Sequence, residues 1–222
     1  MAKRSVSTRV RLSRETIVAS AVALADAEGL EAVTIRRLAQ EHGVTPMAMY
    51  WHFSDKDSLL DGLSDYLIAS VAWPEPSDAP WDEQLHGLLE AFLVALRPHP
   101  ALAALALRRI LVAEPGLRIA ERVLDLLRQA GFATERAVEI GTFLLCSVIT
   151  LVASDPTPAF PAGEDHAAMK RQKTAALGAL PPETYPLVVA AAPALVNCRA
   201  QDGYFALNLD LLVQGVLGLS RG

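Results

Sequence analysis

Residues 34–53 constrain this chain most, because they contain two short helical patterns separated by a tight turn. Thr34 is a good N-cap, and apolar residues recur after it at helical spacing. Gly43 ends this first helix. Thr45 caps the second helix, with Pro46 at the first helical position, where proline is tolerated. Two short helices joined by a turn that contains glycine are typical of a helix-turn-helix.

The segments on either side of this unit also have helical patterns. Ser13 is a good N-cap for a helix that runs to Glu28, and Gly29 supplies the left-handed stop. Ser54 is expected to cap a further helix, with Asp57 as the reciprocal carboxylate of a capping box. The N-terminal region is therefore predicted to be entirely helical.

Residues 74–80 (PEPSDAP) form a break and a plausible domain boundary. The chain beyond them shows helical patterns and no period-two alternation typical of strands. The candidate helices are Trp81–Leu96, Ala101–Val112, Leu117–Ala130, Thr134–Ser154, His166–Leu177 and Asp202–Leu219. Residues 181–193 are ambiguous, and the wider segment 155–201 is either mobile or embraces a partner subunit. We predict an all-α fold.

Composition excludes several classes of protein. The chain is 52% apolar and 20% charged, which is typical of an ordered globular protein. No uninterrupted apolar run reaches the roughly 18 residues that span a bilayer, and no signal peptide follows Lys3 and Arg4. Two cysteines, Cys146 and Cys198, make neither a disulfide framework nor a zinc site, so a cytoplasmic setting is expected. No catalytic, metal or phosphate-loop motif is present, and we expect no enzyme activity and no cofactor.

A helix-turn-helix places its second helix in the major groove of DNA, with the N-terminal residues nearest the base edges. These residues are Thr45, Pro46, Met47 and Ala48, which favour apolar contacts such as those to thymine methyl groups. Arg36 is suited to a bidentate contact with guanine. The candidate phosphate contacts are Thr34, Tyr50, His52 and Lys56. The alternative is an ordinary all-α domain in which two capped helices share a glycine turn.

The sequence of residues 13–63 resembles the DNA-binding domain of the TetR (tetracycline repressor) family of bacterial transcriptional regulators. The resemblance rests on GLEAVTIRRLAQEHGV and on the residues that follow it, Tyr50-Trp51-His52-Phe53, Lys56, Leu59 and Leu60. It implies an all-α homodimer with an N-terminal three-helix DNA-binding domain and a larger helical ligand-binding and dimerisation domain. We accordingly expect a basic flexible arm at residues 1–12, the helix-turn-helix domain at 13–56 and the second domain at 57–222.

The resemblance also implies roles for single residues. The four candidate phosphate contacts match phosphate-contacting positions of the family, and Arg36 matches a base-reading position. Residues 46–48 match variable base-reading positions and differ from those of the tetracycline repressors, so a different operator is expected. Trp51 and Phe53 are expected to pack within the domain, and His42 to be a solvated cation at a helix C-terminus.

The last predicted helix carries a broad apolar face that consists of Phe205, Leu209, Leu212, Val213 and Val216. The resemblance implies that this helix and the one at 134–154 form a four-helix bundle with their two-fold mates. The alternative is a core helix of a monomer.

The resemblance further implies a ligand pocket in the second domain. Tetracycline repressors bind a magnesium–drug chelate through a histidine, to which His99 falls close in register. Thr150 stands at the position of the partner's carboxylate, and one imidazole does not hold a hard cation. We therefore expect no metal and a largely apolar effector. The candidate pocket residues are His86, Phe92, Arg97, His99, Thr142, Cys146 and Thr150.

The residues and the resemblance together predict a repressor that binds a palindromic DNA operator as a homodimer and is released by a small molecule. A regulator controlled by a partner protein, or one that acts as an activator, stays open as an alternative. An all-α enzyme with an incidental helix-turn-helix is a remote one.

Overall fold

The computed structural model describes residues 12–154, 166–197 and 202–221, and the predicted basic arm and Cys198 lie outside these ranges. The described chain is helical, with no strand in any of the three ranges. Its α-helices are α1 (Arg14–Glu28), α2 (Ile35–Glu41), α3 (Pro46–Tyr50), α4 (Lys56–Ala69), α5 (Trp81–Leu96), α6 (Pro100–Ala103), α7 (Ala106–Arg109), α8 (Glu114–Gln129), α9 (Thr134–Ala153), α10 (His166–Gly178), α11 (Pro186–Asn197) and α12 (Asp202–Ser220). The predicted all-α fold is thus confirmed.

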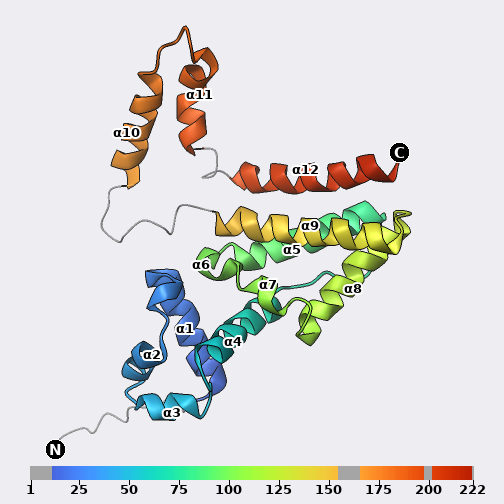
Figure 1. The fold of residues 1–222 in the computed structure, drawn as a ribbon. Helices are drawn as coiled ribbons and strands as arrows, with labels where there is room; N and C mark the ends of the chain where they lie inside the picture. Colours follow the sequence, from blue (N-terminus) through green and yellow to red (C-terminus); the bar gives the residue numbers. More distant parts are fainter. Residues whose placement is uncertain (1–11, 155–165, 198–201, 222) are drawn as a thin grey trace, which may run out of the picture.

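Three parts of the molecule are visible in Figure 1. Helices α1–α4 form the lower end, with α4 leading into the body. Helices α5–α9 make up that body, and α12 lies along α5 and α9. Helices α10 and α11 pack against each other and project away as a hairpin.

The predicted start and end of the first helix are confirmed. The Ser13 hydroxyl accepts the Thr16 N–H at 3.2 Å, and the Thr16 hydroxyl accepts the Ser13 N–H in return. Gly29 ends α1 with a φ of 86°, in the left-handed region that favours glycine. A 3₁₀ turn, η1 (Leu30–Ala32), then leads to α2.

The predicted cap of α4 is wrong by one residue. The N-cap is Asp55, whose carboxylate accepts the Ser58 N–H at 2.7 Å, while Ser58 takes the reciprocal role. The predicted cap, Ser54, instead donates its hydroxyl to Asp55 Oδ2 at 3.1 Å. A carboxylate forms the stronger hydrogen bond at the positive end of a helix, which explains the shift.

The predicted helix Ala101–Val112 is also corrected, because it divides into α6 and α7 at residues 104–105. The carbonyl of Leu105 accepts a hydrogen bond from the hydroxyl of Ser64, which is buried on α4. This long-range contact draws the backbone toward α4 at the break. By contrast, the ambiguous segment 181–193 is helical from Pro186, where α11 begins, and the helix continues through Pro193.

One continuous core joins α1–α4 to the body and to α12. In the body, Trp73 stacks on Phe92 with ring centroids 5.9 Å apart, and Phe92 is almost completely buried. Gly141 lets α9 lie close to α8, because a Cβ there would approach Val123 to 3.2 Å. The same absence of a side chain at Gly116 admits the backbone of Ile110.

Candidate DNA-binding and effector sites

The helix-turn-helix is built by two side-chain caps and a turn. The Thr34 hydroxyl accepts the Arg37 N–H at 3.1 Å and starts α2, and the Thr45 hydroxyl accepts the Ala48 N–H at 3.3 Å and starts α3. Gly43 has a φ of 64°, which reverses the chain between them. Both predicted caps are confirmed, and the unit lies at the lower extremity of the molecule (Figure 1).

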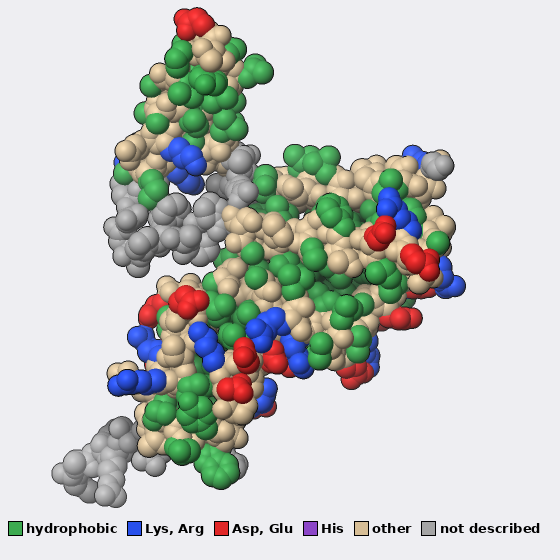
Figure 2. All heavy atoms as spheres, viewed as in Figure 1, with side chains coloured by type: hydrophobic (Ala, Val, Ile, Leu, Met, Phe, Trp, Pro, Cys, Tyr) green, Lys and Arg blue, Asp and Glu red, His purple; other side chains and the backbone are tan. Residues whose placement is uncertain are grey.

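One buried residue fixes the orientation of α3. Met49 is fully buried, so the opposite face of this short helix points outward. On that face Met47 is 69% exposed and Tyr50 is 49% exposed. Apolar side chains are accordingly visible at the lower end of the space-filling view (Figure 2). The structure thus presents the α3 residues that the sequence proposed as base and phosphate contacts.

The two aromatic residues predicted to pack have opposite environments. Phe53 is buried as expected, and the Arg14 guanidinium lies 4.4 Å above its ring. The prediction for Trp51 is wrong, because its side chain is 87% exposed beside Tyr50. Trp51 is the C-cap of α3, so the path of the chain after this helix decides whether its indole is buried or exposed. An exposed indole on this surface is a contact candidate that the sequence analysis missed.

Of the two adjacent arginines on α2, one is held in ion pairs and the other is not paired with any described residue. Arg37 binds Glu28 at 2.8 Å and Glu41 at 2.9 Å, and these carboxylates raise the pKa of its guanidinium further. Arg36 is exposed and makes no ion pair with any described residue. This difference favours Arg36 as the base-reading residue, as the sequence predicted.

Three further residues of the helix-turn-helix end, Lys56, His52 and His42, differ in their exposure to solvent. Lys56 is exposed at the start of α4, and His52 is half-exposed, with its carbonyl accepting Arg14 Nη1 at 3.2 Å. His42 is half-buried, so the expectation of a fully solvated side chain is wrong. Its Nε2 is shielded from solvent and has no hydrogen-bond partner among the described residues.

The seven candidate pocket residues do not line one cavity. Phe92 is buried in the core. His86 Nε2 lies 3.2 Å from Asp210 Oδ1 on α12. The Arg97 guanidinium lies 4.6 Å from the ring centroid of Phe205. These three residues hold α5 and its neighbours together. None of the three lines either of the two hollows described next, and their place in a pocket stays a prediction.

Two hollows are bordered by three small polar residues that recur every four positions on α9, namely Thr142, Cys146 and Thr150. Thr142 and Cys146 line a cavity of about 250 Å³ between α7, α8 and α9. Cys146 and Thr150 line a more open groove of about 490 Å³ between α9 and α12. These candidate pocket residues therefore border two separate hollows.

The apolar face predicted for dimerisation is mostly the inner face of α12. Phe205, Leu209, Val213 and Val216 are each at most 5% exposed within the protomer, and only Leu212 of that set is half-buried. Side chains that are already covered by their own chain have little area left for a partner, so these four are corrected to core residues. The outward face of α12 carries Leu207, Leu211 and Leu219, each more than half exposed.

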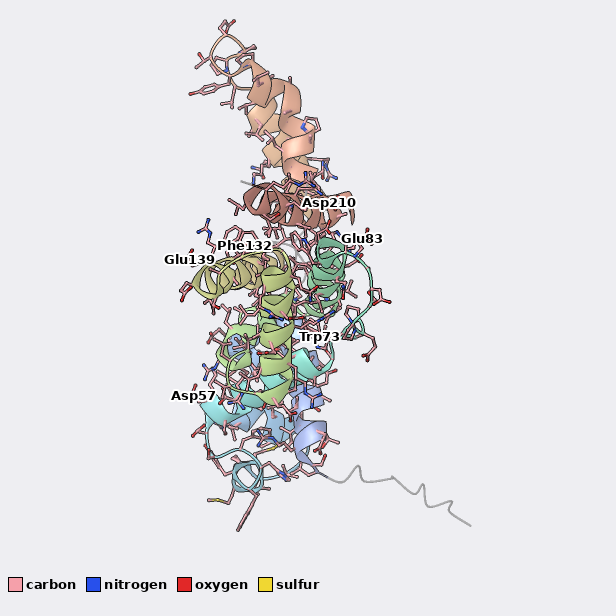
Figure 3. All side chains as sticks on the ribbon, turned by 90° about the vertical axis from the view of Figure 1, so that its right-hand side faces the viewer. Asp57, Trp73, Glu83, Phe132, Glu139 and Asp210 are labelled. Atoms are coloured by element: carbon pink, nitrogen blue, oxygen red, sulfur yellow. The ribbon has the colours of Figure 1, made fainter. Side chains whose placement is uncertain are left out.

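A charged seam joins the body to the helix-turn-helix end. Arg108 lies 3.2 Å from Asp57 and 3.3 Å from Asp61, and Arg109 lies 2.9 Å from Asp65. The carboxylates recur every four residues along α4, while both arginines come from α7. Figure 2 shows basic and acidic side chains side by side in this region, and Figure 3 shows Asp57 near the lower end of α4.

Comparisons with known proteins agree with this geometry. Residues 17–63 match the family model described as bacterial regulatory proteins, tetR family, and residues 73–219 match the tetracyclin repressor-like C-terminal domain. The chain belongs to the tetR family. The two matched segments of this tetR-family chain correspond to the helix-turn-helix end and to the body with α12.

Relatives and solved structures extend the match over most of the chain. The tetracycline repressor protein class C of Escherichia coli is 30% identical, over 93% of this chain and 91% of that protein. An HTH-type transcriptional regulator of Saccharopolyspora erythraea is also 30% identical, but the match spans only 67% of this chain and 63% of the relative. The structure of ActR from Streptomyces coelicolor in complex with actinorhodin has a TM-score of 0.75 at 29% identity, covering 94% and 96% of the two chains.

In this tetR-family chain His99 pairs with a carboxylate, although its register had raised the question of metal binding. Its Nδ1 lies 2.7 Å from Asp26 Oδ2 on α1, and its ring meets Tyr66 of α4 edge-on. The described residues contain no group of three or more His, Cys, Asp or Glu side chains placed to hold a metal ion. His99 therefore links the body to the DNA-binding end.

Proposed function

We propose that this tetR-family chain is a transcriptional repressor that binds a palindromic operator as a homodimer and is released by a small-molecule effector. The observation that carries the proposal is the outward face of α3, which a buried Met49 anchors and the free Arg36 flanks. Family membership and relatives that are themselves transcriptional regulators support it. The release step is supported by ActR, whose structure was solved in complex with actinorhodin.

The proposed DNA interface has a base-reading part and a phosphate part. Arg36 and residues 45–48 would read bases, and Thr34, Tyr50, His52 and Lys56 would hold phosphates. We add Trp51 to the interface, because an indole that is 87% exposed at the end of α3 has no packing role in the protomer. The proposed division of the chain is an arm at 1–12, the DNA-binding domain at 13–56 and the effector and dimerisation domain at 57–222.

The proposed dimer interface uses the outward faces of α9 and α12. Helix α9 and residues 203–220 of α12 are long and apolar enough to cross a membrane by length and composition, and a bent α5–α7 pair could add a third span. Only 44% and 22% of the two best stretches is buried within the protomer. A second copy of the chain would cover the exposed apolar side chains, among them Phe143, Leu207 and Leu211.

Glycines on α12 support a close approach at this interface. Gly215 and Gly218 lie within the helix, and a Cβ added at either one would meet no protomer atom within 4 Å. Glycine inside a helix costs about 0.5–1 kcal/mol relative to alanine, and the protomer gains nothing from it here. A partner helix that packs closely would explain both residues. A soluble homodimer in the cytoplasm, with no catalytic activity, is the resulting proposal.

The first test is a genomic pull-down at near-physiological salt, because salt strongly modulates phosphate contacts. The purified protein would be mixed with fragmented DNA of its source, and the bound fragments sequenced. We expect a recurrent inverted repeat, and its neighbouring genes would indicate the effector class. Arg36→Ala should reduce this enrichment, since one base contact of about 1–3 kcal/mol is lost.

The matched control is Arg118→Ala, which removes another exposed arginine, on α8, that pairs with Glu114 within the described part of the chain. This variant should enrich the same fragments as the parent protein. Absence of an inverted repeat, or equal enrichment by both variants, would contradict the proposal. An operator that is bound only in the presence of a second protein would favour the alternative of a partner-controlled regulator.

A further inference from the structure

We infer that Arg14 is a positioning residue for DNA binding, because its guanidinium fixes the turn that joins α3 to α4 (residues 51–55). Arg14 is the first residue of α1 and lies 38 positions before His52, the residue of the turn whose carbonyl it binds. The inference rests on the proposed function, since the side chains that Arg14 orients are proposed DNA contacts. It assigns a role to a residue outside that proposed interface.

The direction of the C-terminal end of α3 depends on contacts outside this helix. It has five residues, of which Met49 is buried. An isolated helix of this length is not stable in water, so tertiary contacts must hold it. Beyond the helix, the Met49 carbonyl accepts the N–H groups of His52 at 2.9 Å and of Phe53 at 3.0 Å. The orientation of Tyr50 and Trp51 therefore depends on what holds the turn after α3.

Arg14 holds two consecutive residues of this turn with one planar group. Its Nη1 donates to the His52 carbonyl at 3.2 Å, and its Cζ lies 4.4 Å from the ring centroid of Phe53. The Phe53 side chain is only 1% exposed, so its ring is fixed in the core. A guanidinium that stacks on a fixed ring presents its N–H groups in a fixed plane. The backbone at residue 52 is thereby tied to the start of α1.

Gly62 on α4 makes room for this contact. It is buried, and an added Cβ would approach Phe53 Cε1 to 3.0 Å and Arg14 Nη2 to 3.5 Å. Helix α1, the turn and α4 therefore meet at the Arg14 guanidinium. A guanidinium has five N–H donors, so a phosphate contact of its own is the competing account. The two accounts differ in the salt dependence of DNA binding and in the motion of the turn without DNA.

The first measurement is the affinity for a duplex that carries the inverted repeat recovered in the pull-down. Arg14→Met keeps an apolar side chain over Phe53 but removes the charge and every N–H donor. It should weaken binding at least about fivefold, since an exposed cation–π contact and a hydrogen bond each contribute a factor of a few. Arg14→Lys should lose at least about threefold although it keeps the charge, because an ammonium does not stack as a plane. The matched control, Arg118→Met on α8, should bind as tightly as the parent protein.

The salt dependence of the same affinity separates positioning from direct contact. Loss of a phosphate contact lowers the slope of log affinity against log salt by about 1, whereas a loosened turn weakens binding at every salt concentration. We expect Arg14→Met to keep the slope of the parent protein at pH 8, where ordinary imidazoles are uncharged. Lys56→Ala, which removes a proposed phosphate contact, supplies the reference for a lowered slope.

Hydrogen exchange of the free protein tests the turn without DNA. The amides of His52 and Phe53 are bonded to the Met49 carbonyl, so they exchange faster if the turn loosens. Arg14→Met should accelerate exchange in residues 50–55 at least about threefold and leave α9 at the rates of the parent protein. A general loss of stability would instead accelerate both regions. Circular dichroism would confirm that each variant keeps its helical content.

The inference is overturned if the parent protein and Arg14→Met bind the operator equally well, or if exchange in residues 50–55 is unchanged. A slope lowered by about 1 would overturn it as well and make Arg14 a phosphate contact. Equal acceleration of exchange in residues 50–55 and in α9 would reduce Arg14 to a residue that stabilises the fold. A parent protein that binds no operator refutes the proposed function, and the exchange rates then still decide whether Arg14 holds the turn.

Discussion

Replacement of Gly116 by alanine should destabilise the protein, although glycine is normally the poorer helix former. Gly116 lies in the first turn of α8, where an added Cβ would come within 2.6 Å of Ile110 Cα and 2.8 Å of its carbonyl carbon. These are backbone atoms, so no rotamer change can relieve the overlap. Real Cβ atoms essentially never approach so closely, and the turn between α7 and α8 would have to move.

The size of the effect follows from two opposing terms. Alanine in a helix gains about 0.5–1 kcal/mol over glycine, because it loses less conformational freedom. Overpacking against a fixed neighbour costs about 1–3 kcal/mol. We expect a net loss of about 1–2 kcal/mol, which is about 5–30-fold in the unfolding equilibrium.

The matched control is Gly87→Ala on α5. A Cβ at Gly87 meets only a side-chain atom of Pro74, at an ordinary distance of 3.9 Å. Only the helix-propensity term remains there, so this variant should be as stable as the parent or more stable by up to about 1 kcal/mol. Urea unfolding at one fixed protein concentration would measure both variants, because the stability of the proposed dimer would depend on concentration. Equal stability of Gly116→Ala and the parent, or equal destabilisation by both changes, would refute the steric reasoning.

Three further predictions address DNA binding, assembly and pH. Arg36→Ala should cost about 1–3 kcal/mol at one base-pair position, whereas Lys56→Ala should weaken all sequences alike and lower the salt slope by about 1 in binding titrations. Leu211→Lys should weaken the dimer at least about tenfold in sedimentation experiments, while Leu117→Lys, on the outer face of α8, should not. The hydrogen bond from the Ser58 backbone N–H lowers the pKa of Asp55, and the one from the Ser54 hydroxyl lowers it further. The ionised carboxylate therefore stabilises the fold above the usual aspartate pKa range, and this stabilisation is lost as the pH falls through the lowered folded pKa. Asp55→Asn should accordingly reduce the loss of stability at acid pH. An unchanged acid dependence of the unfolding free energy would contradict this prediction.

The sequence was sufficient wherever the deciding contacts span a few residues. The caps at Ser13, Thr34 and Thr45 and the glycine turns were predicted correctly, because each depends on hydrogen bonds within one helical turn. The bounds of α5 were likewise predicted to the residue, since Pro80 stands directly before its first turn. Even the error at α4 is a shift of one position between two competing caps.

The candidate site was predicted only where it repeats a local pattern. The exposed face of α3 follows from the short helix that Thr45 and Pro46 start. The exposure of Trp51 does not follow from any local pattern, because an indole at a helix end can turn toward the core or toward solvent. The cavity was also unpredictable, since its wall combines α7, α8 and α9 and depends on how those helices cross.

The sequence by itself therefore determined the all-α class, the helix-turn-helix and most helix ends, because periodicity and capping are short-range. Only the tertiary structure decided which face of α12 is core, where α7 begins, and that His99 binds Asp26. Each of these depends on a partner that is distant in sequence. A helix that is apolar on two sides, such as α12, carries no local signal of which side its own protomer will cover.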